Sequence, residues 1–169
     1  MPVQWVNRPD ADFRGFSGTI VGGTVQPGVG VRALPSGRTS TVSRISTFDG
    51  DLHEATAGQA ATLVLADEID VSRGDVLCAV SDPAEIADQF EADIVWMHDQ
   101  EMLPGRPYLM KLATQTVGMT LSQPKYKVNV NTLEHLAART LELNEIGVCT
   151  VTTDRPVPFD PYSSNRDMG

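Results

Sequence analysis

The sequence predicts an all-β protein made of two consecutive antiparallel β-barrels. Two observations support this class. First, β-prone runs at 17–21, 29–34 and 40–48 are separated by the turn formers Gly22-Gly23, Pro27-Gly28 and Pro35-Ser36-Gly37. Second, apolar and polar residues alternate along 90–96 and 125–131, as on half-buried strands. The 169 residues, 41% of them hydrophobic, are enough for two small cores.

The first half contains the runs of about six strands. We expect them at 2–7, 17–21, 29–34, 40–48, 59–65 and 76–80. A closed barrel suits this number, because closure removes the exposed edges of a sheet. A turn at Ser81-Asp82-Pro83 marks the boundary, so we expect one barrel at 1–82 and a second at 83–169.

The second half predicts a helical turn at 84–88 and strands at 90–96, 108–113, 117–121, 125–131 and 148–153. One short helix is expected at 132–143, because its apolar residues have helical spacing and Asn131 with Glu134 suits a capping box. The prolines of 155–162 argue against an interior strand. We therefore expect the last strand of the second barrel to be missing and the chain to be a fragment.

Charge and composition exclude several classes. The 13 lysines and arginines stand against 22 acids, a net charge of -9, which disfavours nucleic-acid binding. No run approaches the about 18 apolar residues of a membrane span, and no leader pattern opens the sequence, so we expect a cytoplasmic protein. Cys78 and Cys149 lack a Cys-x-x-Cys spacing. Reduced core thiols are the favoured interpretation, and a disulfide or a reactive or metal-bound role stays open.

No catalytic residue, cofactor-binding residue or metal ligand can be assigned. A phosphate-binding Gly-x-x-x-x-Gly-Lys loop ending at position 38 fails, because Arg32 and Arg38 replace its glycine and lysine. Asn7-Arg8-Pro9-Asp10 resembles a guanine-reading motif but has no βαβ unit around it. His53, His98 and His135 are too far apart in the sequence to suggest a zinc site.

Two segments are candidate contacts with another domain or a partner. Arg14 lies between Phe13 and Phe16, which together could present a cation and aromatic rings, or the two phenylalanines could simply fill the barrel. Lys125 and Lys127 lie on the polar side of an alternating strand. Such a face is either an ordinary solvent face or a partner contact.

Several motifs resemble known families. The run from Arg14 to Gly28 resembles the second-domain signature of translational GTPases such as elongation factor Tu. Further blocks resemble the large, GTPase subunit of bacterial sulfate adenylyltransferase: Val3-Gln4-Trp5-Val6-Asn7-Arg8-Pro9, Thr47-Phe48-Asp49-Gly50-Asp51-Leu52, Gly58-Gln59-Ala60, Leu103-Pro104-Gly105-Arg106-Pro107-Tyr108, Lys125-Tyr126-Lys127, Asn131-Thr132-Leu133-Glu134 and Leu143-Asn144-Glu145-Ile146-Gly147.

The resemblance implies barrels of the elongation factor Tu domain II and III type. In the resembled family, a GTPase domain using GTP and Mg²⁺ drives formation of adenylylsulfate from ATP and sulfate, and a catalytic small subunit transfers the adenylyl group. Some members also carry an adenylylsulfate kinase domain. Because the resemblance covers only the two barrels, it implies a noncatalytic fragment without a cofactor, whose partners are the small subunit and the absent GTPase domain.

Two other functions remain as alternatives. A translation-factor-like barrel module that binds RNA or tRNA would share the fold, although the net charge of -9 argues against it. An enzymatically active chain would have to act alone. We expect the isolated chain to form no adenylylsulfate from ATP and sulfate and to release no phosphate from GTP.

Overall fold

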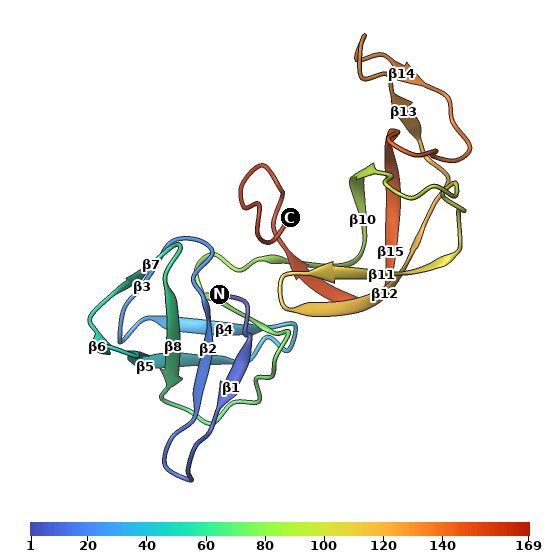
Figure 1. The fold of residues 1–169 in the computed structure, drawn as a ribbon. Coiled ribbons are helices and arrows are strands. Elements are labelled where there is room, and N and C mark those ends of the chain that lie inside the picture. Colours follow the sequence, from blue (N-terminus) through green and yellow to red (C-terminus); the bar gives the residue numbers. More distant parts are fainter. The chain divides into compact units, whose positions relative to one another are not determined.

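The computed structural model describes residues 1–169 and contains fifteen strands and no helix (Figure 1). The predicted all-β class is confirmed. The chain forms two compact units: unit 1 comprises Met1–Ile86, Lys111–Thr116 and Pro158–Gly169, and unit 2 comprises Ala87–Met110 and Val117–Val157. The expected domain boundary at residue 82 stays a prediction.

Nine strands belong to unit 1. They are β1 (Trp5–Asn7), β2 (Gly15–Thr19), β3 (Thr24–Val25), β4 (Gly30–Leu34), β5 (Thr39–Thr47), β6 (Gly50–Leu52), β7 (Ala55–Thr56), β8 (Ala60–Leu65) and β9 (Val76–Ala79). The main sheet runs in the order β1-β2-β8-β5-β4-β9, with β6 paired to β5. Strands β3 and β7 form a separate pair.

The residues before β1 close this sheet into a barrel. Pro2 forms an antiparallel bridge with Val76 of β9. On either side of it, the amide of Leu77 donates to the carbonyl of Met1 at 2.9 Å and the amide of Val3 donates to the carbonyl of Asp75 at 2.8 Å. The first and last strands of the sheet are thereby joined, and the predicted small closed barrel of about six strands is confirmed.

Inward-facing residues of adjacent strands fill the barrel. Phe16 of β2, Leu63 of β8 and Ile45 of β5 pair across neighbouring strands and are almost fully buried. The register of β5 against β8 shifts between Val42 and Arg44, which is the mark of a β-bulge at the intervening residue. The alternation of buried and exposed positions in these strands follows from the two-residue repeat of a β-strand.

Unit 2 is built around the long strand β15. The remaining strands are β10 (Glu85–Val95), β11 (Pro107–Leu112), β12 (Gln115–Leu121), β13 (Tyr126–Val128), β14 (His135–Leu136) and β15 (Ile146–Phe159). The sheet order is β11-β12-β15-β13-β14, and β10 also pairs with β15. The predicted alternation of β10 is confirmed, since Phe90, Ala92 and Ile94 pack on a core that includes Leu121 and Cys149.

The helix predicted at 132–143 is wrong, because the segment holds turns and the two-residue strand β14. The side chain of Asn129, rather than Asn131, caps the chain here: its Oδ1 accepts the amides of Asn131 and Thr132 at 2.9 and 3.3 Å. This Asx-type turn competes with helix initiation. Leu133 then takes a positive φ of 60°, which no helix allows. Its side chain is 74% exposed, so the supposed apolar face does not form.

Two further expectations are corrected. The helical turn expected at 84–88 is absent, because β10 already begins at Glu85. The prolines did not end the last strand either: β15 continues through Pro156 and Pro158 to Phe159. These prolines are two positions apart, so their missing N–H groups fall on the same side of the strand, and the other side keeps its donors.

The last residues of the chain pack within unit 1. Met168 is 1% exposed and lies in a small apolar cluster with Leu34 and Val76. The amide of Asp160 donates to the carbonyl of Met168 at 3.1 Å. The sequence shows no closing apolar element in this polar stretch, so this contact was not predicted. Because all of its regular elements are strands, the structure contains no membrane-spanning helix.

Candidate interaction surfaces

The loop before β2 has a defined shape. Oδ1 of Asp10 accepts the amides of Asp12 and Phe13, both at 2.9 Å, which holds the loop in an Asx-type turn. The turn brings the Phe13 ring onto β2 at Gly15, where a Cβ atom added to the glycine would lie 3.0 Å from the Phe13 ring. Gly15 therefore provides the space in which this ring lies against the strand.

Two arginines stack on the phenylalanines of this loop. The Arg44 guanidinium carbon lies 5.3 Å from the centre of the Phe13 ring, and that of Arg14 lies 5.3 Å from the centre of the Phe16 ring. Both distances fall within the range of cation–π attraction. Nε of Arg44 also lies 3.8 Å from a carboxylate oxygen of Asp51.

The two predicted phenylalanines take different places. Phe16 is 1% exposed and belongs to the core of unit 1, which is the structural alternative that the sequence left open. Phe13 is partly exposed. Phe13 and Arg14, together with Arg44, form the accessible part of this surface.

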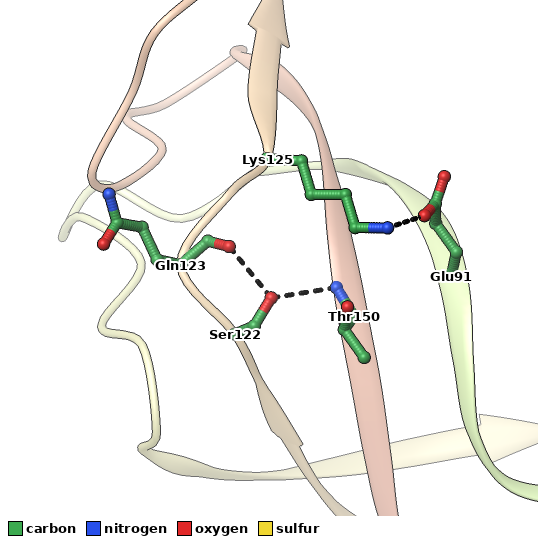
Figure 2. Close-up of polar contacts among 5 residues, drawn as sticks. All are labelled: Glu91, Ser122, Gln123, Lys125 and Thr150. Carbon is green, nitrogen blue, oxygen red and sulfur yellow. Dashed lines mark hydrogen bonds and ion pairs between the residues drawn. The ribbon is translucent and has the colours of Figure 1, made fainter.

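Lys125 lies on the polar outer side of unit 2. Figure 2 shows its ammonium group directed at the carboxylate of Glu91 on β10, with which it forms an ion pair. In the same view, Oγ of Ser122 donates to the carbonyl of Gln123 and accepts the amide of Thr150, both at 2.9 Å. The Lys125 side chain is 51% exposed, so the pair lies open to water.

Lys127 is the more enclosed of the two lysines. Its ammonium group donates to Oε1 of Glu145, while Oε2 of Glu145 accepts the amide of Glu142 at 2.9 Å. The Glu142 amide and the Lys127 ammonium both lower the pKa of Glu145, and the hydrogen bond to Glu145 raises the pKa of Lys127. Both candidate lysines are therefore neutralised by carboxylates of unit 2.

Unit 1 also contains a pocket of about 560 Å³. Apolar residues of the barrel line it together with the acidic residues Asp82, Glu85 and Asp160. Cys78 also lines this pocket, and burial raises the pKa of its thiol. Burial likewise raises the pKa of Cys149 in unit 2, and neither cysteine is in a disulfide. Both groups are therefore weakly reactive thiols at neutral pH.

The structure contains no group of three or more His, Cys, Asp or Glu side chains arranged to hold a metal ion.

One exposed aromatic residue was not among the candidates from the sequence. Phe48, which lies at the end of a strand predicted from the sequence, is fully exposed in the turn between β5 and β6. A phenylalanine directly before the turn formers Asp49-Gly50 is the signal that could have identified it.

Comparisons with known proteins agree on the kind of domain. The family model "Elongation factor Tu domain 2" matches residues 16–78, and the model "GTP-eEF1A C-terminal domain-like" matches residues 89–169. Among solved structures, Sup35 complexed with GDP is similar with a TM-score of 0.89 and 18% identity, over 100% of this chain and 42% of that chain. At that identity the similarity shows the fold alone.

Curated relatives are much more similar in sequence. The bifunctional enzyme CysN/CysC of Xylella fastidiosa (strain Temecula1) is 53% identical over 169 residues, which is 100% of this chain and 27% of the relative. Sulfate adenylyltransferase subunit 1 of Aeromonas salmonicida (strain A449) is 47% identical over 169 residues, 100% of this chain and 36% of the relative. The chain thus spans about a third or less of the length of the relatives it matches.

Proposed function

We propose that the chain, which is 53% identical over its whole length to a CysN/CysC enzyme and 47% identical to a sulfate adenylyltransferase subunit 1, is the noncatalytic two-barrel module of such a subunit. In this role it serves sulfate activation, in which ATP and sulfate give adenylylsulfate at the expense of GTP hydrolysis. The observation that carries the proposal is the 53% identity that extends over all 169 residues.

The residues of this chain do not fit a GTP site of their own. A phosphate-binding loop joins a strand to a helix, whose N-terminus receives the phosphates. Gly37 and Arg38 instead lie in the turn between the antiparallel strands β4 and β5, and the structure contains no helix. We therefore assign GTP and Mg²⁺ to a GTPase domain outside this chain, and the adenylyl transfer to a separate catalytic small subunit.

The module then acts as a scaffold between that GTPase domain and the small subunit, in the cytoplasm. Phe13 and Arg14 of unit 1 and Lys125 and Lys127 of unit 2 are the proposed contact residues. Because the two lysines already pair with Glu91 and Glu145, a partner carboxylate would have to compete with these ion pairs or join them. Arg14 is the one cation among the proposed contact residues that forms no ion pair, so a partner carboxylate could reach it without breaking one.

The test is binding between this chain and the catalytic small subunit from the same organism, measured by isothermal titration calorimetry. We expect a saturable complex, and we expect the double variant Arg14→Ala, Lys125→Ala to bind at least fivefold more weakly. Loss of a rim cation also reduces the salt dependence of association. Arg38→Ala, in the exposed turn between β4 and β5, is the matched control and should bind as the unaltered chain does.

The absence of a complex at the highest practical concentrations would overturn the scaffold function. A complex whose affinity the double variant leaves unchanged would keep the scaffold but remove these contact residues from it.

A further inference from the structure

The turn between β5 and β6 carries a phenylalanine, Phe48, whose ring packs in none of the apolar clusters of the protein. Thr47 of β5 pairs with Gly50 of β6, so Phe48 and Asp49 form the two-residue turn. Gly50 takes a φ of 121°, and Oγ1 of Thr47 donates to the carbonyl of Gly50 at 2.8 Å. The turn geometry is therefore fixed by its neighbours, and the Phe48 ring is fully exposed.

Phe48 is the most exposed aromatic residue of unit 1, at 103% against 64% for Trp5 and 63% for Tyr162. The other four phenylalanines of the chain are buried or partly buried, and Phe16 lies in the core. An exposed aromatic ring on a fixed turn loses little conformational freedom when it is buried by a partner, because it has only two side-chain torsions. Aromatic side chains of this kind form the central anchors of protein interfaces.

The charges around Phe48 define the chemistry of its partner. Asp49 lies in the turn beside Phe48, and Asp51 follows it on β6. Glu54 comes after β6, and its carboxylate accepts a hydrogen bond from Nε2 of Gln26 at 2.6 Å. Arg44 lies near Asp51 at 3.8 Å, whereas Asp49 forms no ion pair. Phe48 is thus surrounded by more carboxylates than cations. A partner surface that complements this charge must be basic.

We propose that Phe48 inserts into an apolar pocket with lysine or arginine side chains on its rim, and that this pocket lies on the catalytic small subunit. The choice of partner rests on the proposed function, whereas the chemistry of the pocket rests on the turn alone. Nucleic acid does not fit this surface, because the carboxylates would face phosphates. In a chain with a net charge of -9, Phe48 and the neighbouring carboxylates would thus recognise a basic protein surface.

The experiment compares three variants of the chain in binding to the small subunit by titration calorimetry at several salt concentrations. Phe48→Ala should raise Kd at least tenfold. Because the ring is fully exposed, its removal should leave the thermal unfolding midpoint unchanged. Asp49→Asn should raise Kd twofold to fivefold at low salt and reduce the salt dependence of binding.

Leu109→Ala is the matched control, because Leu109 is an apolar residue of β11 that is 76% exposed. It should change Kd by less than twofold. The inference is overturned if Phe48→Ala binds within twofold of the unaltered chain, or if Leu109→Ala weakens binding as much. Failure of the unaltered chain to bind the small subunit would instead overturn the proposed function, and with it the choice of this partner.

Discussion

At the scale of single residues, Gly18 shows how a missing side chain closes the barrel. A Cβ atom added at Gly18 would lie 2.2 Å from the carbonyl oxygen of Pro2, a backbone atom that cannot move aside alone. Pro2 is the residue that bridges to Val76 of β9. The closure of the sheet therefore depends on the absence of a side chain at Gly18.

Gly18→Ala should lower the free energy of unfolding by about 1–3 kcal/mol, the usual cost of forcing extra atoms into a packed site. Urea unfolding followed by circular dichroism measures it. Gly30→Ala on β4 is the control, because its added Cβ would meet Cγ2 of Val80 at an ordinary 3.5 Å. That variant should stay within about 0.5 kcal/mol of the unaltered protein. Equal effects at both positions would contradict the role of the Pro2 contact.

At the scale of elements, the Lys127–Glu145 ion pair ties β13 to the turn that precedes β15. The lowered pKa of Glu145 means that its carboxylate is more stable in the folded state. This stabilisation is present above the ordinary value of 4.5 and is lost as pH falls through the lowered pKa. The raised pKa of Lys127 acts in the opposite direction, so its share is present below 10.5 and is lost as pH rises through the raised pKa.

Glu145→Gln should therefore remove part of the acid sensitivity of unfolding. Between pH 6 and pH 3, the urea midpoint should fall less in this variant than in the unaltered chain, while the variant should be the less stable of the two at pH 6. Glu91→Gln, which alters the exposed pair with Lys125, serves as the comparison and should change the pH profile less. Parallel pH profiles for Glu145→Gln and the unaltered chain would show that Glu145 does not contribute.

The same elements show what the sequence could predict. The strand containing Phe90, Ala92 and Ile94 was predicted because its alternation is local and matches its burial. The segment 132–143 was predicted wrongly because its apolar spacing suits a helix, whereas the Asn129 side chain bonds the following amides and Leu133 takes a positive φ. Side-chain bonds of this kind are set by single residues, so periodicity cannot show them.

Long-range placement was the other limit. The sequence identified Phe13, Phe16 and Arg14 as one candidate, but only the pairing of Phe16 with Leu63 of β8 separates the core residue from its accessible neighbours. The ion pairs of the two lysines depend on Glu91 and Glu145, which lie 34 and 18 residues away in the chain. The burial of Met168 likewise depends on Leu34 and Val76, which no local pattern connects to it.

At the scale of the whole molecule, a module that binds RNA or tRNA is the alternative to the proposed scaffold. The 22 acids against 13 lysines and arginines oppose it, because an RNA-binding surface gains affinity by replacing the counterions of phosphates with its own cations. Arg14 and Arg44, near β2 and β5, form a small cationic site on this otherwise acidic chain.

Charge should decide between these functions, so the chain should bind tRNA no more tightly than a Kd of about 100 µM, the weak end of nonspecific binding. Filter binding at several salt concentrations measures this affinity. Micromolar binding that falls steeply with salt would contradict the prediction. The double variant Arg14→Ala, Arg44→Ala would then show whether these two arginines bind the phosphates. If that variant still bound, the phosphate contacts would lie elsewhere on the chain. Weak binding that is unaffected by the variant and by salt would leave the acidic surface, including the turn at Phe48, to a basic protein partner.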